Sequence, residues 1–209
     1  MSDLSSFEEL EREIEKVKDD FYSETGKNMF FKNKQKYDCA KQVINKIPLE
    51  LLFARTCYNI ENTVYVIIDY PIMKTYASPE IINELSDYII SIFSQVIKKY
   101  GTFEVMMNLD GFTISAADRF KKLIEVFCMK CFNQGTGFAM IVNKFVVYNT
   151  TSVIDSFKPL VAHLIEENVR KRLFIISKKD SGEYNQMVAT YHLVSMEYSR
   201  NPKGDEGVK

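Results

Sequence analysis

The sequence predicts an α/β fold with a mixed or parallel sheet and packed helices. Short apolar runs bounded by turn residues, which are typical of buried strands, occupy residues 63–69, 103–109, 138–142 and 173–176. Longer segments with apolar residues at helical spacing separate these runs. After the second run a Gly turn precedes a Ser that can begin a helix, and a strand, turn and helix in this order make half of a βαβ unit.

Length and composition limit the class of protein. The 209 residues fit one main domain with an appendage, and 27 basic against 28 acidic residues give a net charge of -1, which does not favour nucleic acid as a partner. The 15 Phe, 12 Tyr and 9 Met residues suit a core or an adaptable apolar pocket. There is no recognisable secretion signal or membrane-spanning run, and the four Cys are sparse, so we expect a cytoplasmic protein with reduced thiols.

Residues 1–58 predict a small helical N-terminal portion. A capping Ser begins a helix whose apolar residues recur at spacings of three and four until Gly26, and this stripe faces either the rest of the chain or a second chain. A second helix follows, and Pro48 begins a short third one. We therefore expect an α/β domain at residues 59–200 and a polar tail at residues 201–209.

A basic stretch lies between the first two helices. Residues 27–46 hold six Lys against one acid and also carry aromatic residues. This mixture suits a membrane surface or single-stranded nucleic acid, and a solvated helix face has a similar composition. We expect peripheral attachment to a membrane, without nucleic-acid binding. The expected docking residues are Lys27, Phe30, Phe31, Lys32, Lys34 and Lys36.

Elements alternate through the α/β portion. Ser78 precedes a Pro and begins a long helix with a broad apolar face, which ends at Gly101. The next helix begins at Ser115 and keeps its apolar residues on one side. Pro159 interrupts the helix before the last strand, and residues 184–194 form a closing helix.

The reactive residue types form no recognisable catalytic or metal site. Cys128 and Cys131 have a C-x-x-C spacing, but they lie mid-helix on the apolar side and lack a second ligand pair, so we expect core packing. The two His are isolated, and the Gly pair at residues 133–137 precedes a strand, whereas a phosphate-binding loop follows one. Carboxylates near strand ends, such as Asp69 and Asp110, have no spacing that forces a catalytic pair. We therefore expect a binding protein without metal or cofactor, and no enzyme.

Three segments share their order and spacing with a known family. Residues 103–113 form an apolar strand that ends in Asp, Gly and an apolar residue. Residues 156–160 contain a helix-breaking Lys-Pro step, and residues 170–176 place basic residues before an apolar strand. In these features the C-terminal two-thirds of the chain resembles the CRAL-TRIO family of lipid-binding and lipid-transfer domains.

The resemblance implies a sheet with helices on one side and an apolar cavity that holds a lipid tail beneath a gate helix. Burial of an acyl chain gains about 0.8 kcal/mol per methylene, so such a cavity supplies affinity without catalysis. In phosphatidylinositol-binding members a basic residue at the start of the last strand contacts the headgroup, and Arg172 has the matching position. The expected ligand-binding residues are Met106, Met107, Phe112, Ile114, Phe127, Phe157, Lys158 and Arg172.

The chain departs from the family pattern in two segments. The turn at residues 133–137 lacks the acid-and-arginine pair of phosphatidylinositol-binding members. Residues 178–200 lack the Leu-Pro and Gly-Gly pairs that usually accompany the gate helix.

These observations lead to two functional hypotheses. The first is non-enzymatic binding of a lipid or another small apolar ligand, with lipid transfer or lipid sensing at a membrane. The second is a protein-interaction or scaffold module without a ligand cavity, either CRAL-TRIO-like or of the STAS type, whose related topology carries a phosphorylatable Ser or Thr. Ser115 has the position for that modification, and a plain helix N-cap is its other interpretation.

Overall fold

The structure is a computed structural model. It describes residues 5–27, 30–132, 137–155 and 163–200, with the backbone alone at residues 5–7 and 192–200. The expected ligand-binding residues Phe157 and Lys158, and the expected tail, lie outside the described residues.

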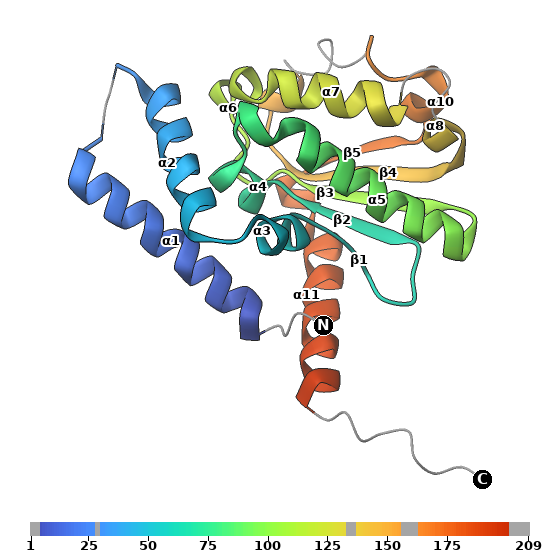
Figure 1. Cartoon of the computed structure of the whole chain (residues 1–209). Coiled ribbons are helices and arrows are strands. Elements are labelled where there is room, and N and C mark those ends of the chain that lie inside the picture. The colour runs from blue at the N-terminus through green and yellow to red at the C-terminus, as the bar shows by residue number, and fades with distance from the viewer. Residues whose placement is uncertain (1–4, 28–29, 133–136, 156–162, 201–209) are drawn as a thin grey trace.

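A five-stranded mixed sheet forms the centre of the molecule (Figure 1). The strands follow the chain in the order β1-β2-β3-β4-β5, with β1 antiparallel to β2 and the remaining neighbours parallel. The sheet confirms the predicted α/β class. Its strands are β1 (Cys57–Asn59), β2 (Tyr65–Asp69), β3 (Phe103–Asn108), β4 (Val142–Thr150) and β5 (Leu173–Ser177).

The strand predicted at residues 138–142 is wrong. The chain forms the short helix α8 (Gly137–Ile141), and β4 begins only at Val142. A short apolar run fits a buried strand or a buried helical turn equally well, so periodicity alone did not separate them. The true strand was missed because it starts with the polar residues Asn143 and Lys144 before its apolar part.

Most helices cover one face of the sheet, where the larger apolar cluster lies. The long helix α5 ends at Gly101, whose positive φ of 75° gives the predicted left-handed stop. In Figure 1, α5 and α7 lie side by side above the sheet. The helices between β2 and β5 in the described part of the chain are α4 (Tyr70–Tyr76), α5 (Ile82–Tyr100), α6 (Ile114–Arg119), α7 (Lys121–Phe132), α8 and α10 (Glu167–Lys171).

The helix after β3 begins at a different residue from the one predicted. Thr113 is the N-cap of α6, because its side-chain oxygen accepts a hydrogen bond from the backbone N–H of Ala116 at 3.2 Å. The hydroxyl of Ser115 donates instead to the side-chain oxygen of Asn33 in α2. The predicted capping role of Ser115 is therefore wrong, because a better-placed Thr lies two residues earlier.

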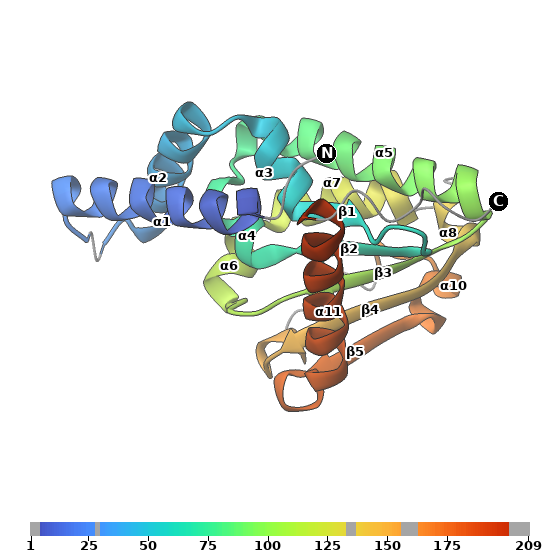
Figure 2. The same ribbon diagram turned by 90° about the horizontal axis from the view of Figure 1, so that it is seen from below.

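The last helix, α11 (Gly182–Arg200), lies on the opposite face of the sheet (Figure 2). Its Tyr184 and Tyr191 pack against a second, smaller apolar cluster that includes Ile67 and Met106. Helices thus cover both faces, although the family resemblance implied helices on one side only.

The N-terminal helices lie beside the sheet. They are α1 (Ser5–Thr25), α2 (Lys32–Lys46) and α3 (Leu49–Thr56). Helices α1 and α2 pack against each other, and α3 connects α2 to β1. The predicted apolar stripe of α1 packs inside this chain, since Leu10, Ile14 and Val17 belong to the same buried cluster as Val43 of α2. Arg55 of α3 forms ion pairs with Glu11 of α1 and with Asp69 at the end of β2, and so joins the N-terminal helices to the sheet.

Candidate functional site

A cavity of about 330 Å³ lies between the sheet and the helices that cover its first face. Protein interiors have few voids larger than a water molecule, so a space of this size is not ordinary packing. Its described lining comes from all four parallel strands and from helices α4, α5, α7 and α10. This volume falls near the lower end of the range for small-molecule sites, about 300–1,000 Å³.

The floor of the cavity is one row of side chains across the sheet. Ile68 pairs with Met107, Met107 pairs with Val147, and Val147 pairs with Ile175, so one residue from each parallel strand points to the same face. Alternation along the strands sends their neighbours to the α11 face. The parallel register therefore fixes which apolar side chains can contact a ligand.

Aromatic rings and an apolar helix face form the walls. The ring of Tyr70 meets those of Phe112 and Phe120 edge to face, with centroid distances of 5.2 Å and 6.0 Å. The remaining described lining residues are Met73, Ile89, Leu109, Leu123, Ile124, Phe127, Cys128, Phe132, Phe145, Ile154, Ile165, Val169, Arg170 and Leu173. Met side chains in such a wall adapt to ligands of different shape.

The expected lining residues separate into two groups. Met107, Phe112 and Phe127 line the cavity. Met106 is buried on the other face of the sheet under α11, because successive strand residues point in opposite directions. Ile114 is 67% exposed at the start of α6 and does not line the cavity.

Arg172 is engaged elsewhere. Its guanidinium donates hydrogen bonds to the carbonyl oxygens of Met140, at 3.2 Å, and Val142, at 2.6 Å. These bonds hold the junction between α8 and β4 against the start of β5. The basic side chain that borders the cavity at this end is Arg170, two residues earlier.

The cavity is electrically neutral over almost all of its described lining. Arg170 is the only charged residue among the described lining residues. Burial raises the pKa of the Cys128 thiol to about 12, so this lining residue stays a neutral thiol at pH 7. Cys128 and Cys131 are both buried and free, which confirms the prediction that they pack in the core.

A group of basic residues borders the cavity at the end formed by α4 and α6. Arg119 lies with its guanidinium carbon 4.3 Å from the ring centroid of Phe120, and Lys74 lies with its ammonium 5.5 Å from that of Tyr70. Both rings line the cavity. Sequence reasoning missed Arg119 and Lys74 because they are far apart in the chain, although an Arg directly before a buried Phe was a usable signal.

The expected docking residues lie around the beginning of α2. Phe30 is 93% exposed and Phe31 is 67% exposed, whereas Lys36 is half-buried. The start of α2 lies at an outer corner of the molecule, away from the sheet (Figure 1). Two adjacent exposed aromatic side chains are unusual on a protein surface.

The described residues bring together no group of His, Cys, Asp or Glu side chains that could hold a metal ion. Within the described part of the chain, no helix has the length and apolar character needed to span a membrane.

The mixed sheet and its covering helices define an α/β domain with an apolar cavity between the two layers. The family model of the CRAL/TRIO domain matches residues 61–195, so the chain belongs to the CRAL/TRIO domain family. This match confirms the resemblance seen in the sequence. Domains of this family generally bind ligands and are not enzymes. A comparison with curated protein sequences gives no significant match.

Proposed function

We propose that the protein binds the hydrocarbon part of a lipid in its cavity and exchanges that lipid with a membrane. The single observation that carries the proposal is the cavity of about 330 Å³, in which Arg170 is the one charged residue among the described lining residues. Apolar cavities of this kind exclude water and take apolar guests. Membership of the CRAL/TRIO family supports the same class of ligand.

The apolar lining of the cavity also supplies affinity for a hydrocarbon chain. Each methylene that moves from water into such a lining gains about 0.8 kcal/mol, so several methylenes together bind without a specific polar contact.

The corner at the start of α2 is the proposed membrane contact. Phe30 and Phe31 present apolar rings, and Lys27, Lys32 and Lys34 supply positive charge for anionic headgroups. Such contact favours lipid exchange, because a lipid that moves directly from the bilayer into the protein keeps its hydrocarbon tail out of water. The alternative hypothesis, a scaffold without a cavity, lacks this support because the described fold contains the cavity.

Native mass spectrometry of the purified full chain tests the proposal. We expect a population carrying one lipid-sized adduct that solvent extraction removes, and uptake of the same adduct from labelled vesicles. A clean apo mass together with no uptake from vesicles would contradict lipid binding.

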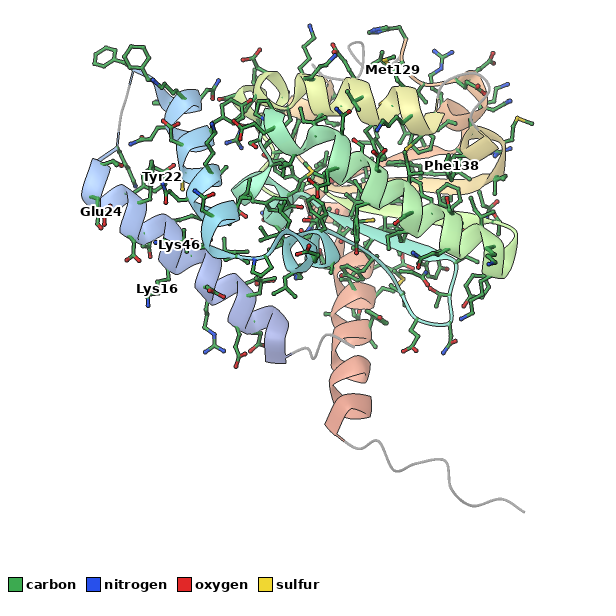
Figure 3. The ribbon with its side chains drawn as sticks, in the orientation of Figure 1. Lys16, Tyr22, Glu24, Lys46, Met129 and Phe138 are labelled. Atoms are coloured by element: carbon green, nitrogen blue, oxygen red, sulfur yellow. The ribbon has the colours of Figure 1, made fainter. Side chains whose placement is uncertain are left out.

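Two substitutions on adjacent residues of α7 sharpen this test. Cys128→Phe places a ring in the cavity wall, whereas Met129→Phe places the same ring on the outer side of the helix, where Figure 3 shows the Met129 side chain. We expect Cys128→Phe to reduce lipid uptake about tenfold, because the added volume displaces ligand, and Met129→Phe to leave uptake unchanged. Equal uptake by both variants would place the lipid outside this cavity.

A further inference from the structure

Three cationic side chains from three helices meet at the α4 and α6 end of the cavity. They are Lys36 of α2, Lys74 of α4 and Arg119 of α6, which we call the cationic cluster. All three are half-buried. Tyr37, the residue after Lys36 in α2, donates a hydrogen bond to the Arg119 carbonyl oxygen, so this turn of α2 lies against the end of α6. Burial lowers the pKa of Lys36, and the positive charges of Arg119, Lys32 and Lys74 lower it further.

The carboxylates that act on Lys74 already have other partners. Burial lowers the pKa of Lys74, and the acids that oppose this shift are Asp110, Asp69 and Glu15. Asp110 is paired with Lys178, Asp69 with Arg55 and Glu15 with Lys18. Among the described residues, none of the three clustered cations forms an ion pair. The three cations of the cluster therefore have no paired carboxylate among the described residues.

Arg119 also carries an unsatisfied donor. Its Nε is buried and has no hydrogen-bond partner among the described residues, which is uncommon for a group that costs about 1–3 kcal/mol when left unpaired. Burial lowers the pKa of Arg119, and the neighbouring hydroxyls of Tyr70, Tyr37 and Tyr22 only partly oppose this effect. The backbone around it is fixed, since Tyr37 donates a 2.7 Å hydrogen bond to the Arg119 carbonyl oxygen.

The turn after β3 leaves room for the ammonium of Lys74. Gly111 has a φ of 71°, a left-handed conformation that Gly adopts without strain. A Cβ at this position would lie 3.0 Å from the Lys74 Nζ, so a side chain here would press on the ammonium. Gly111 thus allows the chain to turn after β3 and also leaves space for the Lys74 ammonium.

The cationic cluster and the cavity share two wall residues. Tyr70 and Phe120 both line the cavity, and the Lys74 ammonium and the Arg119 guanidinium lie over their rings. A ligand with an apolar tail and an anionic group fits this arrangement, because the tail fills the neutral space while the charge reaches the cations at its end. Cations that are partly withdrawn from water bind such a group strongly.

We propose that the cationic cluster of Lys36, Lys74 and Arg119 binds the anionic phosphate headgroup of the lipid whose tail occupies the cavity. This inference rests on the proposed lipid-binding function. The proposed headgroup site differs from the one predicted from the sequence, which was Arg172. The Arg172 guanidinium already donates its hydrogen bonds to backbone carbonyl oxygens. Arg172 and Arg170 lie where β5 begins, whereas the cluster follows the carboxyl ends of β2 and β3, so the two basic regions lie at opposite edges of the parallel sheet.

Isothermal titration calorimetry on the full chain, below the critical micelle concentration of each lipid, tests the assignment. The probes are lysophosphatidic acid and monoacylglycerol with the same acyl chain, and glycerol 3-phosphate, which carries the phosphate without the chain. We expect lysophosphatidic acid to bind at least about tenfold more tightly than monoacylglycerol, because charge-assisted hydrogen bonds are added to the same tail. Glycerol 3-phosphate should bind much more weakly than either lipid.

Substitutions assign the preference to particular residues. Arg119→Met and, independently, Lys36→Met with Lys74→Met should remove the preference for the phosphate while monoacylglycerol still binds. The second variant keeps the test informative if loss of the half-buried Arg119 unfolds the chain. Arg170→Met is a comparison variant at the other end of the cavity. Because Arg170 lines the cavity, its loss acts on both lipids alike, and the ratio of their affinities should stay as in the wild type.

The outcomes separate this assignment from the proposed function. Monoacylglycerol binding with no preference for lysophosphatidic acid would leave lipid binding in place and overturn the headgroup site. Loss of the preference in Arg170→Met alone would overturn it as well, by placing the phosphate at the other end. Tight binding of glycerol 3-phosphate alone would indicate a site for free phosphate esters. Binding of neither lipid by the wild type would overturn the proposed function itself.

Discussion

Arg55 and Asp69 form a buried ion pair where α3 meets the end of β2. The Arg55 Nη1 donates to the Asp69 carboxylate at 2.8 Å, and the Arg55 Nη2 donates to Glu11 of α1 at 2.7 Å. Asp69 is 8% exposed, whereas the Glu11 side chain is 45% exposed. This network joins the N-terminal helices to the sheet through charges that are costly to leave unpaired.

We expect Asp69→Asn to lower the free energy of unfolding by about 3 kcal/mol, because Arg55 would remain buried without its main counter-charge. Glu11→Gln is the matched control at the exposed end of the network, and it should cost less than about 1 kcal/mol because water screens that pair. Urea denaturation of both variants measures the two losses. If the two variants lose similar free energies of unfolding, the buried Arg55–Asp69 pair stabilises the fold no more than the exposed Arg55–Glu11 pair.

The sequence predicts only part of the site. Met107 and Phe112 lie in the segment that resembles the family motif, Phe127 lies on the apolar side of the next predicted helix, and all three line the cavity. Met106 and Met107 were both predicted to contact the ligand, because they are adjacent in the segment that resembles the family motif. Adjacent side chains of a strand point to opposite faces of the sheet, and Met106 lies on the face away from the cavity. Arg119 and Lys74 come together only through the packing of α4 and α6, which no local pattern contains.

The described side chains of α11 are less buried than those of α5. Asn185 exchanges side-chain hydrogen bonds with Asn149, and the rings of Tyr184 and Tyr148 stack with centroids 5.7 Å apart. Residues 182–191 of α11 are nevertheless all partly or fully exposed. By contrast, α5 buries five side chains, Leu85, Ser86, Ile89, Phe93 and Val96.

Hydrogen exchange should therefore separate these two helices. We expect amides in residues 182–191 to exchange at least about tenfold faster than those in the middle of α5, because local opening of α11 exposes less buried surface than unfolding of the core. Mass spectrometry of peptides from the full chain measures both rates, with β3 as an internal reference for the slowest exchange. Equal rates would mean that α11 opens only when the whole protein unfolds.

Elements with strong local signals were predicted well. The strand at residues 103–109 and the helix that ends at Gly101 agree with β3 and α5, because a continuous apolar run and a left-handed Gly each act locally. β1 was missed because three residues carry too little pattern, and its existence depends on antiparallel pairing with β2. The short run at 138–142 failed because its length suits a helical turn as well as a strand.

Across the whole molecule, three features follow one another from the surface to the interior. The exposed corner at Phe30 and Phe31 is followed along α2 by Lys36, which belongs to the cationic cluster, and the cluster shares walls with the cavity. With this arrangement, the headgroup of an anionic lipid would stay close to Lys side chains along its whole way from the membrane to the cavity. A cavity is a property of packing among distant elements, which is why the sequence indicated it only through the family motif.

If this corner contacts membranes, charge reversal there should weaken binding to anionic vesicles. We expect Lys32→Glu with Lys34→Glu to lower vesicle binding about thirtyfold at low salt, since each basic residue near an anionic surface contributes about 1 kcal/mol. The effect should shrink as added salt screens the charges. Lys98→Glu with Lys99→Glu makes the same change of net charge at the exposed end of α5, far from this corner in Figure 1, and should have little effect. Sedimentation with phosphatidylserine vesicles measures the binding of the wild type and of both double variants. If the two double variants lose the same amount of binding, the loss is an effect of net charge, and the start of α2 is not a specific membrane contact.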